Sequence, residues 1–353
     1  MNEQFRCPLC HADDWQTVER FGYRKSGPTS ALAPARIMLW RGLRAIARIF
    51  LLARPSRRVS SSPPASVYET RRRAVLFDVW FPDSDEVTLT TRYCRDCGFM
   101  TYAPRPTNDD IAAKYGYLYA EPGQAAQKPA APSPRAVEFD AIRAARIHAT
   151  CTAQVGGGRL RVLDYGGSTG RLMKPFLDDG HECYLVDYDS SPIDGVTKRA
   201  DDIAGLPDEG LFDVIICSHV LEHVSEITEL VRALRERLTP DGIVYAEVPQ
   251  EIWAGVPLEA EPVTHINYFT RNSFANLFRV NGFDVIKSAQ QVSVYEQWHL
   301  EVVWVVAKPG DGPRRPGGSV DIESLLHPSR IYSARKMFDT VVAPKVGDLL
   351  GHR

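Results

Sequence analysis

The sequence lacks the features that mark several large protein classes. Its formal net charge is only −2, from 42 Lys and Arg against 44 Asp and Glu, which does not suit a nucleic-acid coat. Internal repeats at solenoid periods are absent. No apolar run reaches the about 20 residues of a membrane-spanning helix, because Arg41, Arg44 and Arg48 interrupt the most apolar stretch. With 44% hydrophobic residues, the 353-residue chain is expected to form two globular domains, or one with additions.

The first residues also lack the charged-then-apolar layout of a secretory signal peptide. We therefore expect a cytoplasmic, reducing location, where paired thiols hold metal more often than they form disulfides. Four of the seven cysteines form two C-x-x-C pairs, Cys7/Cys10 and Cys94/Cys97. Four thiolates complete the tetrahedral ligand set of structural zinc, although the pairs lie much further apart than the usual roughly 15–20 residues. The prediction is one zinc ion, with a redox role as the alternative.

Positive charge is concentrated near the N-terminus. Residues 20–73 hold 13 Lys and Arg and a single acid, Glu69, which leaves the rest of the chain acidic. Within this segment, residues 35–53 have the pattern of a basic amphipathic helix, and residues 54–73 are typical of a flexible linker. Such a helix could make peripheral contact with an anionic membrane surface. Docking onto the protein's own core or a partner chain, or binding nucleic acid, remain open alternatives.

Short apolar runs alternate with helix-length segments between residues 161 and 308. This pattern predicts βαβ units, hence an α/β fold with a mostly parallel sheet. The last two strands follow one another directly and are expected to form an antiparallel closing hairpin. The predicted strands cover residues 161–164, 182–186, 214–218, 242–248, 283–290 and 301–307.

A glycine-rich turn follows the first of these strands, in the run VLDYGGSTGRL at residues 162–172. Its spacing is neither the G-x-G-x-x-G of nicotinamide-binding turns nor a P-loop. It resembles motif I (D/E-x-G-x-G-x-G) of the class I S-adenosylmethionine (SAM) dependent methyltransferases, with serine at the middle glycine. The resemblance implies that SAM is the cofactor and that this turn forms part of its site, through Asp164, Gly166, Gly167, Ser168 and Gly170.

Four further matches to this family follow in the expected order. Asp187 ends the second strand, where a carboxylate accepts the ribose hydroxyls, and Asp202 lies where an acid meets the adenine amino group. FDVIICSHVLEHV at residues 212–224 resembles the fourth-strand motif and adds Ser218 to the cofactor site. LTPDG at residues 238–242 resembles the turn before strand five. The resemblance implies a Rossmann-like SAM methyltransferase sheet and methyltransferase activity.

The second cysteine pair begins another resemblance, CRDCGFMTYAPRP at residues 94–106. It is similar to the N-terminal zinc module of sugar and polysaccharide methyltransferases. We therefore predict a zinc module at residues 1–110, interrupted by a basic insertion at about 26–75. A linker would cover residues 111–135, a methyltransferase domain residues 136–308, and a partly helical tail residues 309–353.

Three histidines are candidates for the base that removes a proton from the methyl acceptor: His219, His223 and His265. The expected acceptor is a small molecule or glycan, with an activated sugar or lipid-linked saccharide favoured. An rRNA methyltransferase with a zinc module is one alternative, although the acidic methyltransferase domain makes nucleic acid the less favoured partner. A non-catalytic SAM-fold binding or scaffold protein is the other. The sequence does not indicate an oligomeric state.

Overall fold

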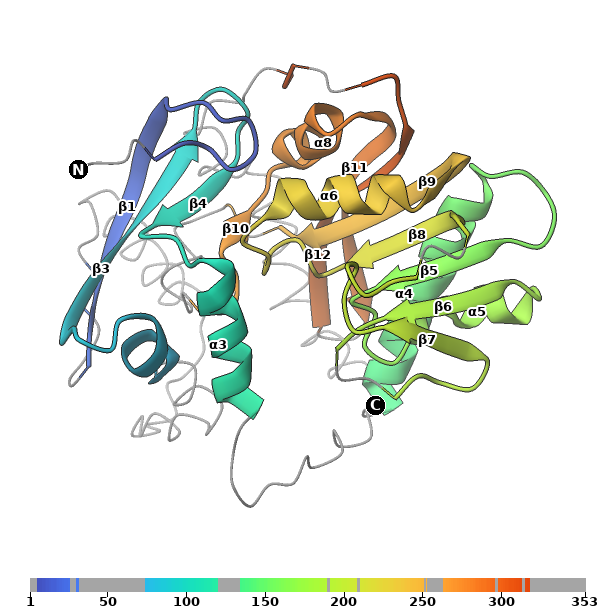
Figure 1. Cartoon of the computed structure of the whole chain (residues 1–353), viewed down its shortest axis with the longest axis horizontal. Coiled ribbons are helices and arrows are strands. Elements are labelled where there is room, and N and C mark those ends of the chain that lie inside the picture. The colour runs from blue at the N-terminus through green and yellow to red at the C-terminus, as the bar shows by residue number, and fades with distance from the viewer. Residues whose placement is uncertain are drawn as a thin grey trace, which may run out of the picture.

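The computed structural model describes residues 5–25, 30–31, 74–119, 134–188, 191–207, 210–250, 252, 263–295, 298–312 and 315–317. The helix predicted at residues 35–53, the flexible linker at 54–73 and the helices predicted near the C-terminus lie outside these ranges. None of the helices within them is long and apolar enough to cross a membrane. The described strands form two sheets, one of seven strands and one of five (Figure 1).

The seven-stranded sheet has the order β11-β12-β9-β8-β5-β6-β7. β5 to β9 run parallel, and β12 pairs antiparallel with both β9 and β11. This confirms the predicted Rossmann-like sheet and its antiparallel closing hairpin; β7 is a strand that the sequence pattern did not predict. The bounds are β5 (Arg161–Tyr165), β6 (Glu182–Val186), β7 (Val196–Ala200), β8 (Phe212–Ser218), β9 (Leu238–Pro249), β11 (Phe283–Tyr295) and β12 (Trp298–Pro309).

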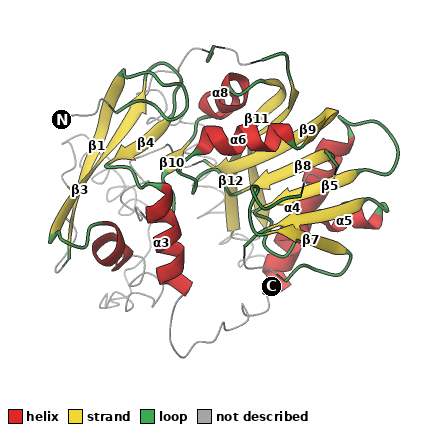
Figure 2. Cartoon of the chain, in the orientation of Figure 1, coloured by secondary structure: helices red, strands yellow, loops and turns green. Residues whose placement is uncertain are grey.

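Helices cover both faces of this sheet (Figure 2). Alternate residues of β8 divide between two cores: Val214 and Ile216 pack with α4 (Pro134–Thr152), η2 (Arg171–Met173) and α5 (Lys174–Asp178). Ile215 and Cys217 pack with α6 (Ile227–Glu236) and α8 (Arg271–Val280). A strand buried on both faces needs a continuous apolar run, which is what residues 214–217 supply.

The smaller sheet is antiparallel, with the order β10-β4-β3-β1-β2. Four strands come from the N-terminal part: β1 (Trp15–Arg24), β2 (Ser30–Ala31), β3 (Glu86–Cys94) and β4 (Met100–Ala103). The fifth, β10 (Asn267–Tyr268), lies after β9 in the sequence and pairs with β4. A segment of the C-terminal half therefore completes the N-terminal sheet, as Figure 1 shows.

Two helices accompany the smaller sheet, the π-helix η1 (Val75–Trp80) and the α-helix α3 (Asn108–Tyr119). They pack against each other, and the Trp80 indole N–H donates to the Asp110 carbonyl at 2.9 Å. Most of α3 lies within residues 111–135, the range for which the sequence predicted a linker. Residues 111–119 are thus helical.

Arg105 connects the two parts of the molecule. Its guanidinium is partly buried and donates to the carbonyls of Val224, Ser225 and Ile266 at 2.8–3.3 Å. Burial lowers the pKa of Arg105 to about 10, so the side chain remains a cation at neutral pH. Five N–H groups in a fixed fork suit several carbonyls at once, and the segment after β4 is thereby fixed to the loop after β8.

Candidate cofactor and acceptor site

The glycine turn after β5 is packed too tightly for side chains at two positions. Gly166 has φ +71°, and a Cβ there would lie 2.4 Å from Val220 Cγ2. A Cβ on Gly167 would lie 2.1 Å from Asp164 Oδ2. The Gly166 N–H donates to the Val186 carbonyl at 2.8 Å, which fixes the turn against the end of β6. Glycine is required at residue 166 because Val220 of the loop after β8 lies against it, and at residue 167 because the Asp164 carboxylate lies beneath it.

Ser168 adopts the left-handed conformation that glycine adopts without strain. Its φ is +55°, and its backbone N–H donates to Asp187 Oδ2 at 2.9 Å. The turn after β5 is thus hydrogen-bonded to the carboxylate at the end of β6. The predicted cofactor residues Asp164, Gly166, Ser168 and Asp187 do converge at the carboxyl edge of the parallel strands, where ligands bind in open α/β sheets.

Asp164 is a buried carboxylate that lacks hydrogen-bond donors. Its side chain has no exposed surface, and neither carboxylate oxygen accepts a hydrogen bond from the described residues. Burial, with a smaller contribution from Asp187, raises its pKa to about 7. A ligand with donor groups or positive charge close to the turn would stabilise the ionised form. The residues present therefore fit a cationic ligand such as the methionyl part of SAM.

Asp202 and Ser218, which were also predicted as cofactor residues, are already engaged in hydrogen bonds. Asp202 is exposed just after β7, and its Oδ1 accepts the Gly205 N–H at 2.7 Å. Ser218 is buried at the end of β8, where its hydroxyl donates to Glu247 Oε1 at 2.9 Å. Asp202 is therefore accessible to a ligand, whereas the Ser218 side chain belongs to a buried network.

That network joins α4 to the carboxyl ends of β8 and β9, and sequence reasoning missed it. Arg143 Nη2 donates to Ser218 and to Glu247 Oε1, both at 2.8 Å, while Arg146 Nη2 donates to Glu247 Oε2 at 2.6 Å. Although burial raises the pKa of Glu247, Arg143 and Arg146 outweigh it and hold the pKa at about 2. The signal was present in the sequence, because an acid inside an apolar strand requires a buried cation.

His219 directly follows β8, next to the glycine turn. It has a left-handed φ of +58°, and its backbone N–H donates to the Glu247 carbonyl at 3.0 Å. Its Nδ1 lies 3.2 Å from Glu222 Oε1, and its buried Nε2 has no hydrogen-bond partner among the described residues. A non-glycine residue held in this conformation is often found at functional sites.

His223 and His265, which are 42 positions apart in the sequence, lie in contact. Their ring centroids are 4.8 Å apart and edge-to-face. His223 Nδ1 is 2.7 Å from the Thr264 carbonyl, and burial lowers the pKa of His223 to about 4. All three predicted histidines thus gather around Glu222, which sequence reasoning did not select. The Glu222 side chain is only 2% exposed.

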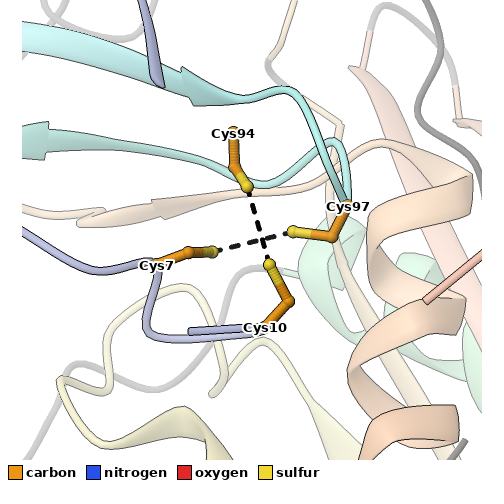
Figure 3. Close-up of side chains that lie close together, drawn as sticks. All are labelled: Cys7, Cys10, Cys94 and Cys97. Carbon is orange, nitrogen blue, oxygen red and sulfur yellow. Dashed lines mark hydrogen bonds between the residues drawn. The ribbon is translucent and has the colours of Figure 1, made fainter. Parts of the chain in front are cut away.

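The four predicted zinc ligands lie together (Figure 3). Cys7 Sγ is 3.7 Å from Cys97 Sγ, and Cys10 Sγ is 3.6 Å from Cys94 Sγ. Zinc–sulfur bonds of about 2.3 Å give tetrahedral edges of about 3.8 Å, which these distances approach. All seven cysteines are free. The donor set and its geometry therefore fit one zinc ion.

The two C-x-x-C turns have the same backbone geometry. The His11 N–H donates to the Cys7 carbonyl at 2.8 Å, and the Gly98 N–H donates to the Cys94 carbonyl at 2.9 Å. Both donor residues have positive φ, +62° and +77°. The position that Gly98 occupies after the second pair is thus occupied by His11 after the first. Cys151, Cys183 and Cys217 are buried outside this cluster.

Residues 124–288 match a family model described as a methyltransferase domain. This range contains the glycine turn, the Arg143–Glu247 network and all three histidines. The ubiquinone biosynthesis O-methyltransferase of Rickettsia typhi is 28% identical over 96 residues, which cover 24% of this chain and 39% of that protein. The Rickettsia canadensis protein of the same name is also 28% identical, over 41% of its length. The chain thus spans about two fifths of these curated relatives.

Solved methyltransferase structures are similar to this domain at low identity. Burkholderia thailandensis 1,6-didemethyltoxoflavin-N1-methyltransferase, solved with S-adenosylhomocysteine (SAH), has a TM-score of 0.44 and 19% identity, over 63% of this chain and 96% of that one. Glycopeptide N-methyltransferase MtfA, complexed with SAM, has a TM-score of 0.37 and 18% identity, over 47% of this chain and 94% of that one.

Proposed function

We propose that this chain is a SAM-dependent methyltransferase that acts on a small-molecule or glycan acceptor, with an activated sugar or lipid-linked saccharide favoured. The observation that carries the proposal is Asp164, a fully buried carboxylate that accepts no hydrogen bond from the described part of the chain. It lies directly beneath a glycine turn at the carboxyl edge of a parallel sheet. The match of residues 124–288 to a methyltransferase domain supports it.

The cofactor would supply a methyl group on a sulfonium sulfur. Asp164 and the backbone of Gly166, Gly167, Ser168 and Gly170 would surround its methionyl part. Asp187 would accept the ribose hydroxyls, and the exposed Asp202 would face the adenine. Ser218 would stabilise this edge of the site through its hydrogen bonds with Arg143 and Glu247, and would not contact the cofactor itself.

We assign the general base to His219. The Glu222 carboxylate next to Nδ1 keeps the proton on that nitrogen, which leaves Nε2 with its lone pair. Nε2 would take the proton of an acceptor hydroxyl as the oxygen attacks the methyl carbon. His223 is less suited, because its low pKa of about 4 makes it a weak base. His265 would form part of the acceptor wall.

Calorimetric titration of the purified chain with SAM and SAH tests this function, followed by methyl transfer to nucleotide sugars. Binding of both ligands at one site per chain is expected. Absence of binding would favour the scaffold alternative. Steeply salt-dependent binding and methylation of rRNA would favour the alternative that the basic segment at residues 20–73 suggests.

We also propose that Cys7, Cys10, Cys94 and Cys97 hold a structural zinc ion. The Cys97 carbonyl accepts from Asn276 Nδ2 at 3.3 Å, and the Pro8 carbonyl accepts from Thr228 Oγ1 at 3.2 Å. The cysteine cluster is thereby attached to α8 and α6. Zinc content measured on the purified chain should be about one ion; a zinc-free chain of unchanged stability would refute this role. Peripheral membrane contact through residues 35–53 stays a prediction.

A further inference from the structure

A second potential metal site lies at the histidines, away from the cysteine cluster. Glu222, His223 and His265 each offer one ligand atom, and the three atoms lie within 4.8 Å of one another. Two imidazoles and one carboxylate are a ligand set that proteins use for divalent transition metals with open coordination positions.

His223 and Glu222 each present a lone pair that could bind a cation. The Thr264 carbonyl can only accept, so the 2.7 Å contact places the His223 proton on Nδ1 and leaves the Nε2 lone pair available. This is the usual outer contact of a metal-binding histidine. Nε2 lies 3.7 Å from Glu222 Oε1. Glu222 Oε1 lies 3.2 Å from His219 Nδ1, and Glu222 Oε2 accepts no hydrogen bond from the described residues, although the side chain is only 2% exposed.

Backbone hydrogen bonds hold the two ligand segments together. The Ile266 and Asn267 N–H groups donate to the Glu222 carbonyl at 2.9 and 3.1 Å. The Asn267 side-chain amide donates to the carbonyls of Leu221 and Val224, both at 2.7 Å. The loop after β8 and the segment that leads into β10 are therefore fixed to each other, so little ordering would be needed when a cation binds.

A third cluster of potential ligands lacks the features that suit the Glu222 cluster for a metal. His148, Asp179 and His181 also lie within 4.8 Å of one another. However, the Leu160 N–H donates to His181 Nδ1, so the proton of the neutral ring is on Nε2, where it blocks ligation. Asp179 is 56% exposed and pairs with His148 at 2.9 Å. This cluster supplies a matched control.

We propose that Glu222, His223 and His265 bind a divalent transition-metal cation that holds the oxygen of the methyl acceptor. The role rests on the proposed methyltransferase function. The cation would orient the acceptor hydroxyl and make it more acidic. The hydroxyl proton would pass to His219, the oxygen would bond to the methyl carbon of SAM, and the electron pair of the broken carbon–sulfur bond would stay on sulfur, which gives SAH. His219 Nδ1, 3.2 Å from Glu222 Oε1, couples this base to the metal site.

Electron paramagnetic resonance of Mn²⁺ tests the site on the full chain with its cysteine-bound zinc retained. Thiolates favour zinc, whereas imidazole and carboxylate accept Mn²⁺, so this probe discriminates between the two clusters. We expect the wild type to bind one Mn²⁺ per chain, which lowers the resonance signal of free Mn²⁺ accordingly. Glu222→Gln and, as a second variant, His265→Gln should each weaken this binding more than about 100-fold. The control variant His148→Gln should bind as the wild type does.

SAH binding is measured on the same samples, so that the two proposals can fail separately. No Mn²⁺ binding by the wild type, or equal binding by Glu222→Gln and His265→Gln, would overturn the metal site even if SAH binds normally. Absence of SAH binding with intact Mn²⁺ binding would instead refute the methyltransferase role and leave the metal site in place.

Discussion

Asp164 Oδ2 occupies the space that a side chain on Gly167 would need: a Cβ built there would lie 2.1 Å from this oxygen. The buried acid and the glycine turn above it are thus one unit. The turn can follow this path only because residue 167 has no side chain, and the acid is shielded from water by the turn.

Gly167→Ala should therefore weaken SAH binding and destabilise the fold. The new methyl group must displace the turn or the buried carboxylate, which we expect to cost about 1–3 kcal/mol. Urea unfolding and calorimetry on the same variant measure both effects. Gly157→Ala is the matched control, because a Cβ there meets nothing within 4 Å. Wild-type behaviour of Gly167→Ala would contradict the packing of the turn.

Asp164 should make stability depend on pH. Burial raises its folded-state pKa from 3.8 to about 7, so the folded chain binds this proton more tightly than the unfolded chain does. The stabilisation is complete below the unfolded pKa and is lost as the pH rises through about 7. The isosteric Asp164→Asn should thus gain stability over the wild type between about pH 5 and about pH 8, by an amount of order 2–4 kcal/mol. Urea unfolding without ligand measures this difference, and a constant difference would contradict it.

Ser168→Gly should stabilise the ligand-free fold. The serine has φ +55°, a conformation that costs an L-residue about 1–2 kcal/mol and glycine almost nothing. Greater freedom of glycine in the unfolded chain offsets part of this gain, so we expect an increase of up to about 1 kcal/mol. Ser168→Ala keeps the strain and serves as control. If both variants unfold at the same urea concentration, strain at residue 168 is negligible.

The Arg143–Glu247 pair should be strongly coupled. Glu247→Gln leaves the part-buried Arg146 without its anion and Arg143 with Asp140 alone, at 3.5 Å, and should cost about 3–5 kcal/mol. The double variant Glu247→Gln/Arg143→Met should lose less than the sum of the single losses. Because the pKa of Glu247 is depressed to about 2, its contribution exists above its ordinary pKa and is lost as the pH falls toward about 2. Strict additivity in urea unfolding would show that the network contributes little.

Cys94→Ser should remove the zinc ion and loosen the smaller sheet. The cysteine lies at the end of β3 and belongs to the same core as α6 and α8, so the loss is expected to reach β10 and the neighbouring His265. Metal analysis and amide hydrogen exchange measure the two effects. Cys183→Ser, in β6, should keep the zinc. Full zinc content in Cys94→Ser would contradict the assignment of the four ligands.

Local sequence patterns predicted the larger sheet well and the smaller one poorly. β5, β6, β8 and β9 are apolar runs bounded by turns, whereas β7 (VTKRA) carries two cations and gives no such signal. The strands of the smaller sheet were not foreseen either, and β10 is only two residues long and pairs with β4, which lies more than 160 residues earlier in the sequence. Such pairing depends on tertiary packing, which no local pattern encodes.

Within the site, too, residues in local motifs could be predicted and residues joined only by tertiary contacts could not. Motif resemblance selected Asp164, Asp187 and the three histidines, because these residues lie in recognisable runs. Glu222, at the centre of the histidines, was overlooked although it lies within one of those runs. Arg143 and Arg146 lie on α4, more than 100 residues before Glu247 in the sequence, yet both donate to the buried Glu247 carboxylate on β9. Only the fold brings these residues together.

Calorimetric titration of SAH into the wild type and Asp187→Ala tests the central claim most directly. Asp187 ends β6, its Oδ2 accepts the Ser168 N–H, and we assign it the ribose contact. The control is Asp201→Ala, an exposed acid that pairs with Lys198. The account predicts one SAH per chain for the wild type and the control, and at least about 100-fold weaker binding for a folded Asp187→Ala. Equal affinity in all three, or no binding by the wild type, would contradict it.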